Sequence, residues 1–551
     1  MAYEPRHSPD HDNTGWPPGV PYIIGNEGCE RFSYYGMRAI LTVFLAQYLY
    51  IHHPVFSQDA ERTAKAHYHV FAGAVYLFPL LGAVIADRLF GKYRTILWLS
   101  MVYVAGHAVL AVSEHSVTGF WIGLGLIAVG SGGIKPNVSA HVGDQFGRGN
   151  WFRVPTIFQA FYFIINFGSA GATLLIPKTL EWYGPTVAFG IPGVLMGLAT
   201  VAFWMGRKVF VHVPAHPAGK LGTLDAISSS LFVIAFAHLF APAVFHDVSW
   251  RVLVPSALGF IVLGAIVFAV RQRMRQDDGF LAVLAYAVKG YFTGSKVEGD
   301  VPDVTHADPA VQARRERLVK SRFFGGAARH FGIEAAEGPP AVLRVVSVFF
   351  LVSVFWALFD QHGSSWVLQA KTMNLQLPGV GEVKPSQIAA LNPLMVMILI
   401  PVNNKLIYPG IGKLGFEMTP LRRMTGGMLV AGLSFLLVAF IQHRIEAAGE
   451  GQVSFLWQAL PYFVITQAEV MVSITGLEFA YTQAPKRMKS TVMGFWLAAV
   501  AGGNLFVALF ETFSKLPLAT GFMVYAGLMF GAGVLFGIRA YFYQPQDYVQ
   551  D

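Results

Sequence analysis

Apolar stretches of membrane length recur along the whole chain, separated by short polar segments. A helix needs about 20 apolar residues to cross the hydrocarbon layer of a membrane. The stretches predict six helices in the first part of the chain, near residues 22–50, 67–86, 95–113, 118–142, 154–177 and 186–205. They predict six more in the last part, near 341–370, 386–408, 424–442, 453–483, 490–512 and 518–541. Two further spans are expected between these sets, near 228–245 and 252–270, so the pattern predicts fourteen.

This spacing predicts an all-α polytopic membrane protein with two six-helix bundles and two inserted helices. The expected parts are an N-terminal tail (1–20), a first bundle (21–211), a two-helix insertion (212–275), a linker (276–340), a second bundle (341–543) and a C-terminal tail (544–551). The linker contains the basic run ARRERLVKSRFF (313–324). Its basic face could rest on anionic lipid, although a solvated linker is the simpler interpretation.

Composition and charge agree with a membrane protein and give its orientation. The sequence is 54% hydrophobic and 13% charged, about half the charged fraction of a soluble domain. Lys and Arg gather in alternate loops, including DRLFGKYR (87–94), RQRMR (271–275) and APKRMKS (484–490), whereas SEHSVT (113–118) has none. Because short cytoplasmic loops are enriched in these residues, we expect both termini in the cytoplasm. The basic excess therefore gives no reason to expect nucleic-acid binding.

Enzymatic signatures are weak in this sequence. GSGGIKPN (130–137) lacks the Gly-Lys-Ser/Thr end of a phosphate-binding loop. His212 and His216 are separated by Pro214, which argues against a zinc pair on a helix. There is no local signature of a nucleophilic triad, and Cys29 is the only cysteine. We therefore expect that the protein is not an enzyme and that it binds no metal ion and no cofactor.

Ionisable side chains lie inside the apolar spans, where each costs several kcal/mol unless it is paired, protonated or wet. The acids are Glu27, Glu30, Asp360, Glu469 and Glu478, and the bases are Arg31, Arg38 and Lys135. One interpretation is that such charges only join helices to one another. A set of this size in both halves instead favours a polar cavity. Because acids outnumber bases, some carboxyl group must often be protonated. This is what a proton-coupled carrier needs, and a zwitterionic solute would fit the same cavity.

Five motifs resemble those of the proton-dependent oligopeptide transporters (POT), a family of the major facilitator superfamily. They are EGCERFSYYG (27–36), GAVIADRLFGKYR (82–94), FYFIINFGS (161–169), FWALFDQHGSSW (355–366) and TGLEFAYTQAP (475–485). The resemblance covers both halves. It implies the major facilitator fold, and bacterial members similarly insert two helices between the bundles.

The resemblance also implies substrate and gate roles. Arg31 and Lys135 would hold the carboxylate of a peptide, and Glu478, with Asn166 and Asn392, would hold its amine. Aromatic side chains would line the side-chain pockets, although packing in the core explains each one equally well; they are Tyr34, Tyr35, Tyr76 and Trp496. Arg38 with Asp360 would close an outer gate, and Lys135 with Glu478 an inner gate.

Proton coupling is expected at Glu27 or Glu30, because both lie within one helical turn of Arg31. A substrate carboxylate that competes for Arg31 would leave the partner acid without its counter-charge, and a proton would then neutralise it. Which acid carries the proton stays open, with His69 and Asp360 as further candidates. His69 resembles a coupling histidine of animal members, but a packing role is equally plausible.

These observations predict a proton-coupled symporter of di- and tripeptides in the inner membrane. Its partners would be peptides, protons and membrane lipid; we expect a monomer driven by the proton gradient. A same-fold carrier of another solute, such as nitrate or a peptide-like metabolite, is the alternative, and the Glu27, Glu30 and Arg31 set argues against nitrate. A peptide receptor without transport could keep the binding residues, but it would not need two gate pairs.

Overall fold

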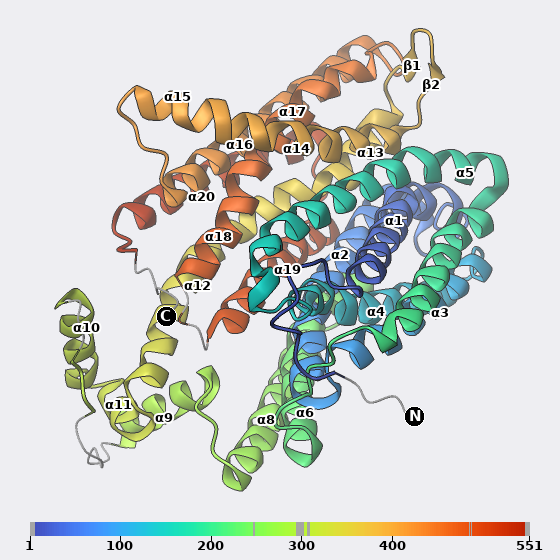
Figure 1. Cartoon of the computed structure of the whole chain (residues 1–551). Helices are drawn as coiled ribbons and strands as arrows, with labels where there is room; N and C mark the ends of the chain where they lie inside the picture. The colour runs from blue at the N-terminus through green and yellow to red at the C-terminus, as the bar shows by residue number, and fades with distance from the viewer. Residues whose placement is uncertain are drawn as a thin grey trace.

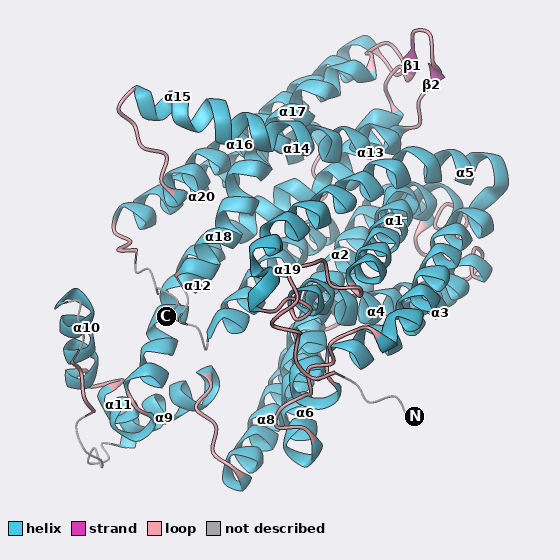
Figure 2. Ribbon diagram, in the orientation of Figure 1, coloured by secondary structure: helices cyan, strands magenta, loops and turns pink. Residues whose placement is uncertain are grey.

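The computed structural model describes residues 6–245, 248–293, 302–305, 309–483, 485 and 488–545. Almost all of this chain is helical (Figure 2). The described strands form one short antiparallel hairpin, β1 (Gln376–Leu377) with β2 (Gly381–Glu382). We call the side of the molecule that carries this hairpin the hairpin side (Figure 1).

The first half contains five long helices and two short π-helical extensions. They are α1 (Val20–Phe44) with Leu45–Leu49, α2 (Ala60–Ile85) with Ala86–Phe90, α3 (Lys92–Val112), α4 (Val117–Gly143) and α5 (Val154–Met205). Helix α5 joins two predicted spans, and it reverses direction near Gly184 (Figure 1). Gly184 has φ of 78° and precedes Pro185, so the sequence interrupts the helix locally.

The insertion and the linker are more ordered than the sequence predicted. The insertion contains α6 (Gly219–Ala237), η6 (His238–Phe240), α7 (Ala241–Val244) and α8 (Trp250–Met274); the linker contains α9 (Phe280–Thr293), α10 (Pro309–Lys320) and α11 (Gly325–Phe331). The linker predicted at 276–340 therefore contains helices that the sequence analysis did not predict. Val283 and Ala287 of α9 pack against Ala327 of α11, which gives the linker a small core of its own. These helices lie opposite the hairpin, on what we call the linker side (Figure 1).

The second half begins earlier than the predicted residue 341. Its elements are α12 (Ile333–Phe359), η7 (Asp360–Gly363), α13 (Ser365–Lys371), η8 (Pro385–Ala390), α14 (Leu391–Val402), η9 (Asn403–Ile407), α15 (Tyr408–Lys413), α16 (Pro420–Ala448), η10 (Phe455–Gln458), α17 (Ala459–Glu469), η11 (Val470–Ile474), α18 (Thr475–Thr482), α19 (Lys489–Phe513) and α20 (Leu518–Tyr541). Pro339 and Pro340 lie inside α12, so the helix begins before two residues that often mark a helix boundary.

Twelve helical stretches of the described chain are long and apolar enough to cross a membrane. Helix α1 is also of membrane length but carries four ionisable side chains, and the α5 stretch contains two predicted spans. Counted in this way, the described helices agree with the fourteen predicted spans. The prediction of an all-α polytopic membrane protein with inserted helices is confirmed.

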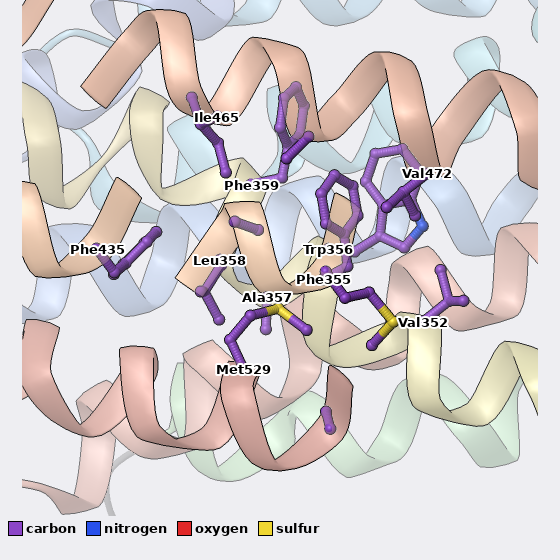
Figure 3. Close-up of a cluster of buried hydrophobic side chains, with 14 of the residues drawn as sticks. Val352, Phe355, Trp356, Ala357, Leu358, Phe359, Phe435, Ile465, Val472 and Met529 are labelled. Carbon is purple, nitrogen blue, oxygen red and sulfur yellow. The ribbon is translucent and has the colours of Figure 1, made fainter. Parts of the chain in front are cut away.

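Each half has its own hydrophobic core. In the second half, residues of α12 such as Phe355 and Leu358 lie among side chains of α16, α17 and α20 (Figure 3). Asp360 follows directly after the last residue of α12, so the packing of this helix positions it. In the first half, Gly82 of α2 lies so close to Gly132 of α4 that an added Cβ would be 2.0 Å from the Gly132 oxygen. The two helices can approach only because both residues are glycines.

The N-terminal segment is held against the linker side of the first half. Arg6 forms a β-bridge with Val211, and the His212 amide donates to the Arg6 carbonyl at 2.6 Å. The Asn150 side chain donates to the Gly15 carbonyl at 3.0 Å. Residues 6–19, predicted as part of a tail, are therefore tied to the bundle, and residues 1–5 lie outside the described residues.

Candidate functional site

A cluster of charges occupies one face of α1. The Arg31 Nε atom donates to Glu27 Oε1 at 2.7 Å and lies 3.4 Å from Glu30 Oε2. Residues four apart share a helix face, so the sequence places Glu27 beside Arg31. Glu30 is fully buried, and it interacts with Arg31, with Lys135 and with the Ser131 hydroxyl. One guanidinium therefore compensates two buried carboxyl groups.

Lys135 of α4 faces the same cluster. Its Nζ atom lies 3.6 Å from the centre of the Tyr34 ring and 5.2 Å from that of Tyr76, and it interacts electrostatically with Glu30. Among the described residues it has no hydrogen-bond partner. The structure thus brings Arg31 and Lys135, the predicted carboxylate-binding pair, to one place. A buried ammonium without a hydrogen bond is well suited to an anionic ligand, although binding itself stays a prediction.

The three residues predicted to hold an amine form no hydrogen bond with one another among those that the described residues make in this conformation. Asn392 donates to Glu469 Oε2 at 2.7 Å and to the Thr466 hydroxyl at 3.1 Å. Asn166 donates to a backbone carbonyl of its own helix, and Glu478 is exposed on α18. The acid beside Asn392 is therefore Glu469, to which the sequence analysis gave no role. Its position as an acid inside an apolar span was the available signal.

The predicted pocket aromatics differ in their surroundings. Tyr34 and Tyr35 lie edge to face, with ring centres 5.2 Å apart, beside the charges of α1. Tyr76 is half-buried beside Lys135. Trp496 is only 3% exposed and packs edge to face against Phe349 and Trp356. In this conformation Trp496 is part of the core of the second half, which is the packing interpretation that the sequence left open.

The predicted outer pair is in contact and joins the two halves. Arg38 of α1 donates to Asp360 Oδ1 at 2.6 Å, and it also donates to the Tyr68 hydroxyl of α2. Asn504 of α19 donates to the other oxygen of Asp360 at 2.7 Å. Both oxygens of the buried carboxylate are therefore satisfied, which a buried ion pair requires. Tyr68 and Asn504 escaped the sequence analysis because neither is charged.

His69 lies between the halves rather than in the core of one. Its Nδ1 atom is 2.8 Å from Asn504 Oδ1, and its Nε2 atom is 2.9 Å from the Ser364 hydroxyl. It is fully buried. His69 is thus linked to Asp360 through the side chain of Asn504, and its role in coupling stays a prediction.

Other polar contacts reinforce closure on the hairpin side. Lys65 lies 2.7 Å from Glu511, Lys371 lies 2.8 Å from Glu61, and Lys384 lies 2.6 Å from Glu181. Each pair joins the first half to the second. The Glu181 carboxylate, through its hydrogen bond, raises the pKa of the Lys384 ammonium. Sequence reasoning missed these pairs because the partners come from the ends of different spans.

The predicted inner pair is apart. Lys135 is enclosed by aromatic rings, whereas Glu478 is exposed on the linker side of the second half. All the contacts between the halves described above lie on the hairpin side. The prediction that Lys135 pairs with Glu478 concerns the alternative conformation, and in this one the two residues make no such pair.

A two-bundle helical membrane fold, with charges buried between bundles that are closed on one side, defines a transport protein of the major facilitator type. The POT family profile matches residues 93–522, so the chain belongs to the POT family, which consists of transporters rather than enzymes. The predicted family and fold are confirmed.

The chain is also similar to individual members of this family. It is 31% identical to human solute carrier family 15 member 2 over 487 residues, which is 86% of this chain and 55% of that protein. It is 32% identical to the Danio rerio protein of the same name, over 79% of this chain and 51% of that protein. The chain spans about half the length of the curated relatives it matches.

Two solved structures match nearly the whole chain. The in meso crystal structure of the POT family transporter PepTSo is 39% identical, covers 97% of this chain and 99% of its own, and has a TM-score of 0.75. The crystal structure of an auto-inhibited POT family peptide transporter is 37% identical, with the same coverage and TM-score. The similarity therefore includes the linker and the inserted helices.

Proposed function

We propose that this protein is a symporter that couples the inward movement of protons to import of di- and tripeptides. The observation that carries the proposal is the buried cluster of Glu27, Glu30 and Arg31 beside the ammonium of Lys135, which has no hydrogen-bond partner among the described residues. In this cluster, Arg31 and Lys135 can bind a substrate carboxylate, and Glu27 or Glu30 can accept a proton. The names of the matched proteins, which include a peptide transporter, support this substrate class.

Coupling follows from competition for Arg31. A peptide carboxylate that binds Arg31 and Lys135 takes the counter-charge of Glu27 and Glu30, and a proton then neutralises one of the acids. Glu30 is the better candidate, because it is fully buried and lies farther from the Arg31 Nε atom than Glu27 does, at 3.4 Å against 2.7 Å. With both peptide and proton bound, fewer charges remain unpaired, so closing the cavity costs less free energy.

The second half would hold the peptide amine. Asn392 and Glu469 offer acceptors in this conformation, and Glu478 is the predicted partner of Lys135 when the linker side closes. Alternation between the Arg38–Asp360 pair and the Lys135–Glu478 pair would then rock the halves around the site. We take the linker side to be cytoplasmic, with both termini there and the protein in the inner membrane.

Uptake into proteoliposomes tests this function. The purified protein should accumulate a labelled dipeptide when an inward proton gradient is imposed, and an ionophore that dissipates the gradient should stop accumulation. Unlabelled di- and tripeptides should compete, whereas nitrate and a single amino acid should not. Accumulation of nitrate or of a non-peptide metabolite alone would select the other-solute carrier. Peptide binding without any uptake would select the receptor.

A further inference from the structure

The hydrogen bonds around Asn504 determine which way its amide is turned. Its Nδ2 atom is 2.7 Å from Asp360 Oδ2 and 3.1 Å from the Val500 carbonyl oxygen. Asp360 is paired with Arg38, so its carboxylate only accepts, and a carbonyl also only accepts. A flipped amide would place three acceptor oxygens together. The Asn504 nitrogen must therefore face Asp360, and its oxygen must face His69.

This orientation determines the tautomer of His69. An amide oxygen cannot donate, so His69 Nδ1, at 2.8 Å, must carry the hydrogen of that contact. A neutral imidazole has only one ring hydrogen, so Nε2 is left as an acceptor, and the Ser364 hydroxyl donates to it at 2.9 Å. We propose that Asn504 is a positioning residue that holds His69 as the Nδ1–H tautomer, so that a proton taken up by His69 enters at Nε2, facing Ser364.

The position of that proton matters because Ser364 belongs to the other half. Ser364 is fully buried, and in the described part of the chain His69 is the only partner of its hydroxyl. When Nε2 carries a proton, it donates to the Ser364 oxygen, and the hydroxyl hydrogen loses its acceptor. Protonation of His69 thus reverses the direction of a hydrogen bond that joins the two halves on the hairpin side. The inference rests on the proposed proton coupling, which it extends from α1 to this contact.

The charged and titratable groups around His69 come from four elements. They are Arg38 of α1, Lys65 and Tyr68 of α2, Asp360 of η7, and Glu511 of α19, which reaches the site through Lys65. Arg38 pairs with Asp360, and Lys65 pairs with Glu511. Because these charges compensate in pairs, the direct hydrogen bonds of Asn504 and Ser364 decide which ring nitrogen is protonated.

Nitrogen NMR of the ring tests the tautomer directly. In full-length protein with ¹⁵N-labelled histidine, the His69 signals are identified by their loss in His69→Gln. We expect neutral wild-type His69 to carry its hydrogen on Nδ1, and Asn504→Leu to give a mixture of tautomers or mainly Nε2–H. The matched control is Asn403→Leu, because Asn403 is equally buried and likewise donates to the carbonyl four residues before it. A wild-type hydrogen on Nε2 would overturn the proposal, even if Asn504→Leu does not fold.

Transport assays distinguish a positioning role of Asn504 from a purely structural one. Asn504→Leu should move the pH midpoint of gradient-driven dipeptide uptake by about 0.5 unit or more, as expected from loss of one hydrogen bond, while exchange of labelled for unlabelled peptide persists. Asn403→Leu should keep the wild-type midpoint. An equal loss of uptake and exchange at every pH would make Asn504 structural and contradict the inference. If wild-type protein does not accumulate peptide at all, the proposed function fails, while the tautomer is still decided by NMR.

Discussion

Single residues explain how α1 can carry charges inside a membrane. Arg31 compensates Glu27 and Glu30, and Arg38 is compensated by Asp360 from the other half. Each uncompensated charge would cost several kcal/mol in this environment. The substitutions that reveal function are therefore those that change one charge and leave the shape of the side chain intact.

Replacing Glu27 or Glu30 with Gln mimics a permanently protonated acid. For the residue that carries the proton, we expect loss of gradient-driven accumulation and retention of peptide exchange, since exchange needs no net proton movement. The two activities can be compared in the same proteoliposomes. Glu450→Gln, in an exposed loop, should behave like the wild type. If both single variants still accumulate dipeptide, the proton is carried elsewhere, and His69 and Asp360 are next to be tested.

Because Arg31 and Lys135 are both predicted to bind the substrate carboxylate, we can predict how an uncharged C-terminus affects recognition. A dipeptide with an amidated C-terminus should compete at least about tenfold more weakly than the free acid, because charge-assisted hydrogen bonds contribute about 1.5–3 kcal/mol. Inhibition of labelled-dipeptide uptake measures the ratio. In Lys135→Gln the difference between acid and amide should shrink. Equal competition by the two forms in the wild type would rule out carboxylate recognition by these cations.

Whole elements are shaped by local breaks in otherwise apolar helices. Gly184 reverses α5 on the hairpin side, close in sequence to Glu181, which pairs with Lys384 of the second half. The π-helical turns Leu45–Leu49 and Ala86–Phe90 extend α1 and α2.

Gly184→Ala should destabilise the protein, because an L side chain is strained at a φ of 78°. We expect a loss of about 1 kcal/mol or more and a lower thermal midpoint. The matched control is Gly171→Ala in the same helix, where an added Cβ meets nothing within 4 Å and the backbone is helical. That change should be neutral or stabilising. Melting curves of the two variants in detergent test the prediction, and equal midpoints would contradict it.

At the scale of the whole molecule, closure of the hairpin side depends on pairs between residues far apart in the sequence. Arg38–Asp360 is buried and Lys65–Glu511 is largely buried, with side chains 13% and 9% exposed, whereas Lys371–Glu61 is exposed. Breaking a buried pair leaves an uncompensated charge, but breaking an exposed pair changes the free energy little. The two kinds of pair should therefore contribute unequally to the balance between conformations.

Asp360→Asn should shift the molecule away from this closed conformation by about 3–5 kcal/mol, because Arg38 stays buried without its counter-charge. Spin labels at Tyr48 and Lys515, both exposed on the hairpin side, should then show a longer distance, in a Cys29→Ser background. Transport should fall, while peptide binding in detergent should survive.

The control for this experiment is Lys371→Gln, which breaks only the exposed pair with Glu61 and should leave the distance distribution unchanged. Wild-type distances and wild-type uptake in Asp360→Asn would refute the role of the Arg38–Asp360 pair as a gate.

The sequence by itself determined the spans, the two halves and the charged face of α1. Membrane-length hydrophobicity and the helical repeat act within about 20 residues, so they can be read without tertiary contacts. Resemblance to the POT family added the Arg38–Asp360 pair, which the structure places in contact. Even the Glu27–Arg31 contact is local, since it lies within one helical turn.

Only the tertiary structure decided which side is closed and which neutral groups connect the charges. Asn504 is 435 residues from its hydrogen-bond partner His69, and Asn392 is 77 residues from Glu469, so no local pattern relates them. Phe280–Phe292 of the linker is an apolar helix that local composition could have indicated, but its packing against α11 depends on tertiary contacts. In this conformation Lys135 lies among aromatic rings and Glu478 is exposed, and these positions depend on contacts spread across the whole interface between the halves.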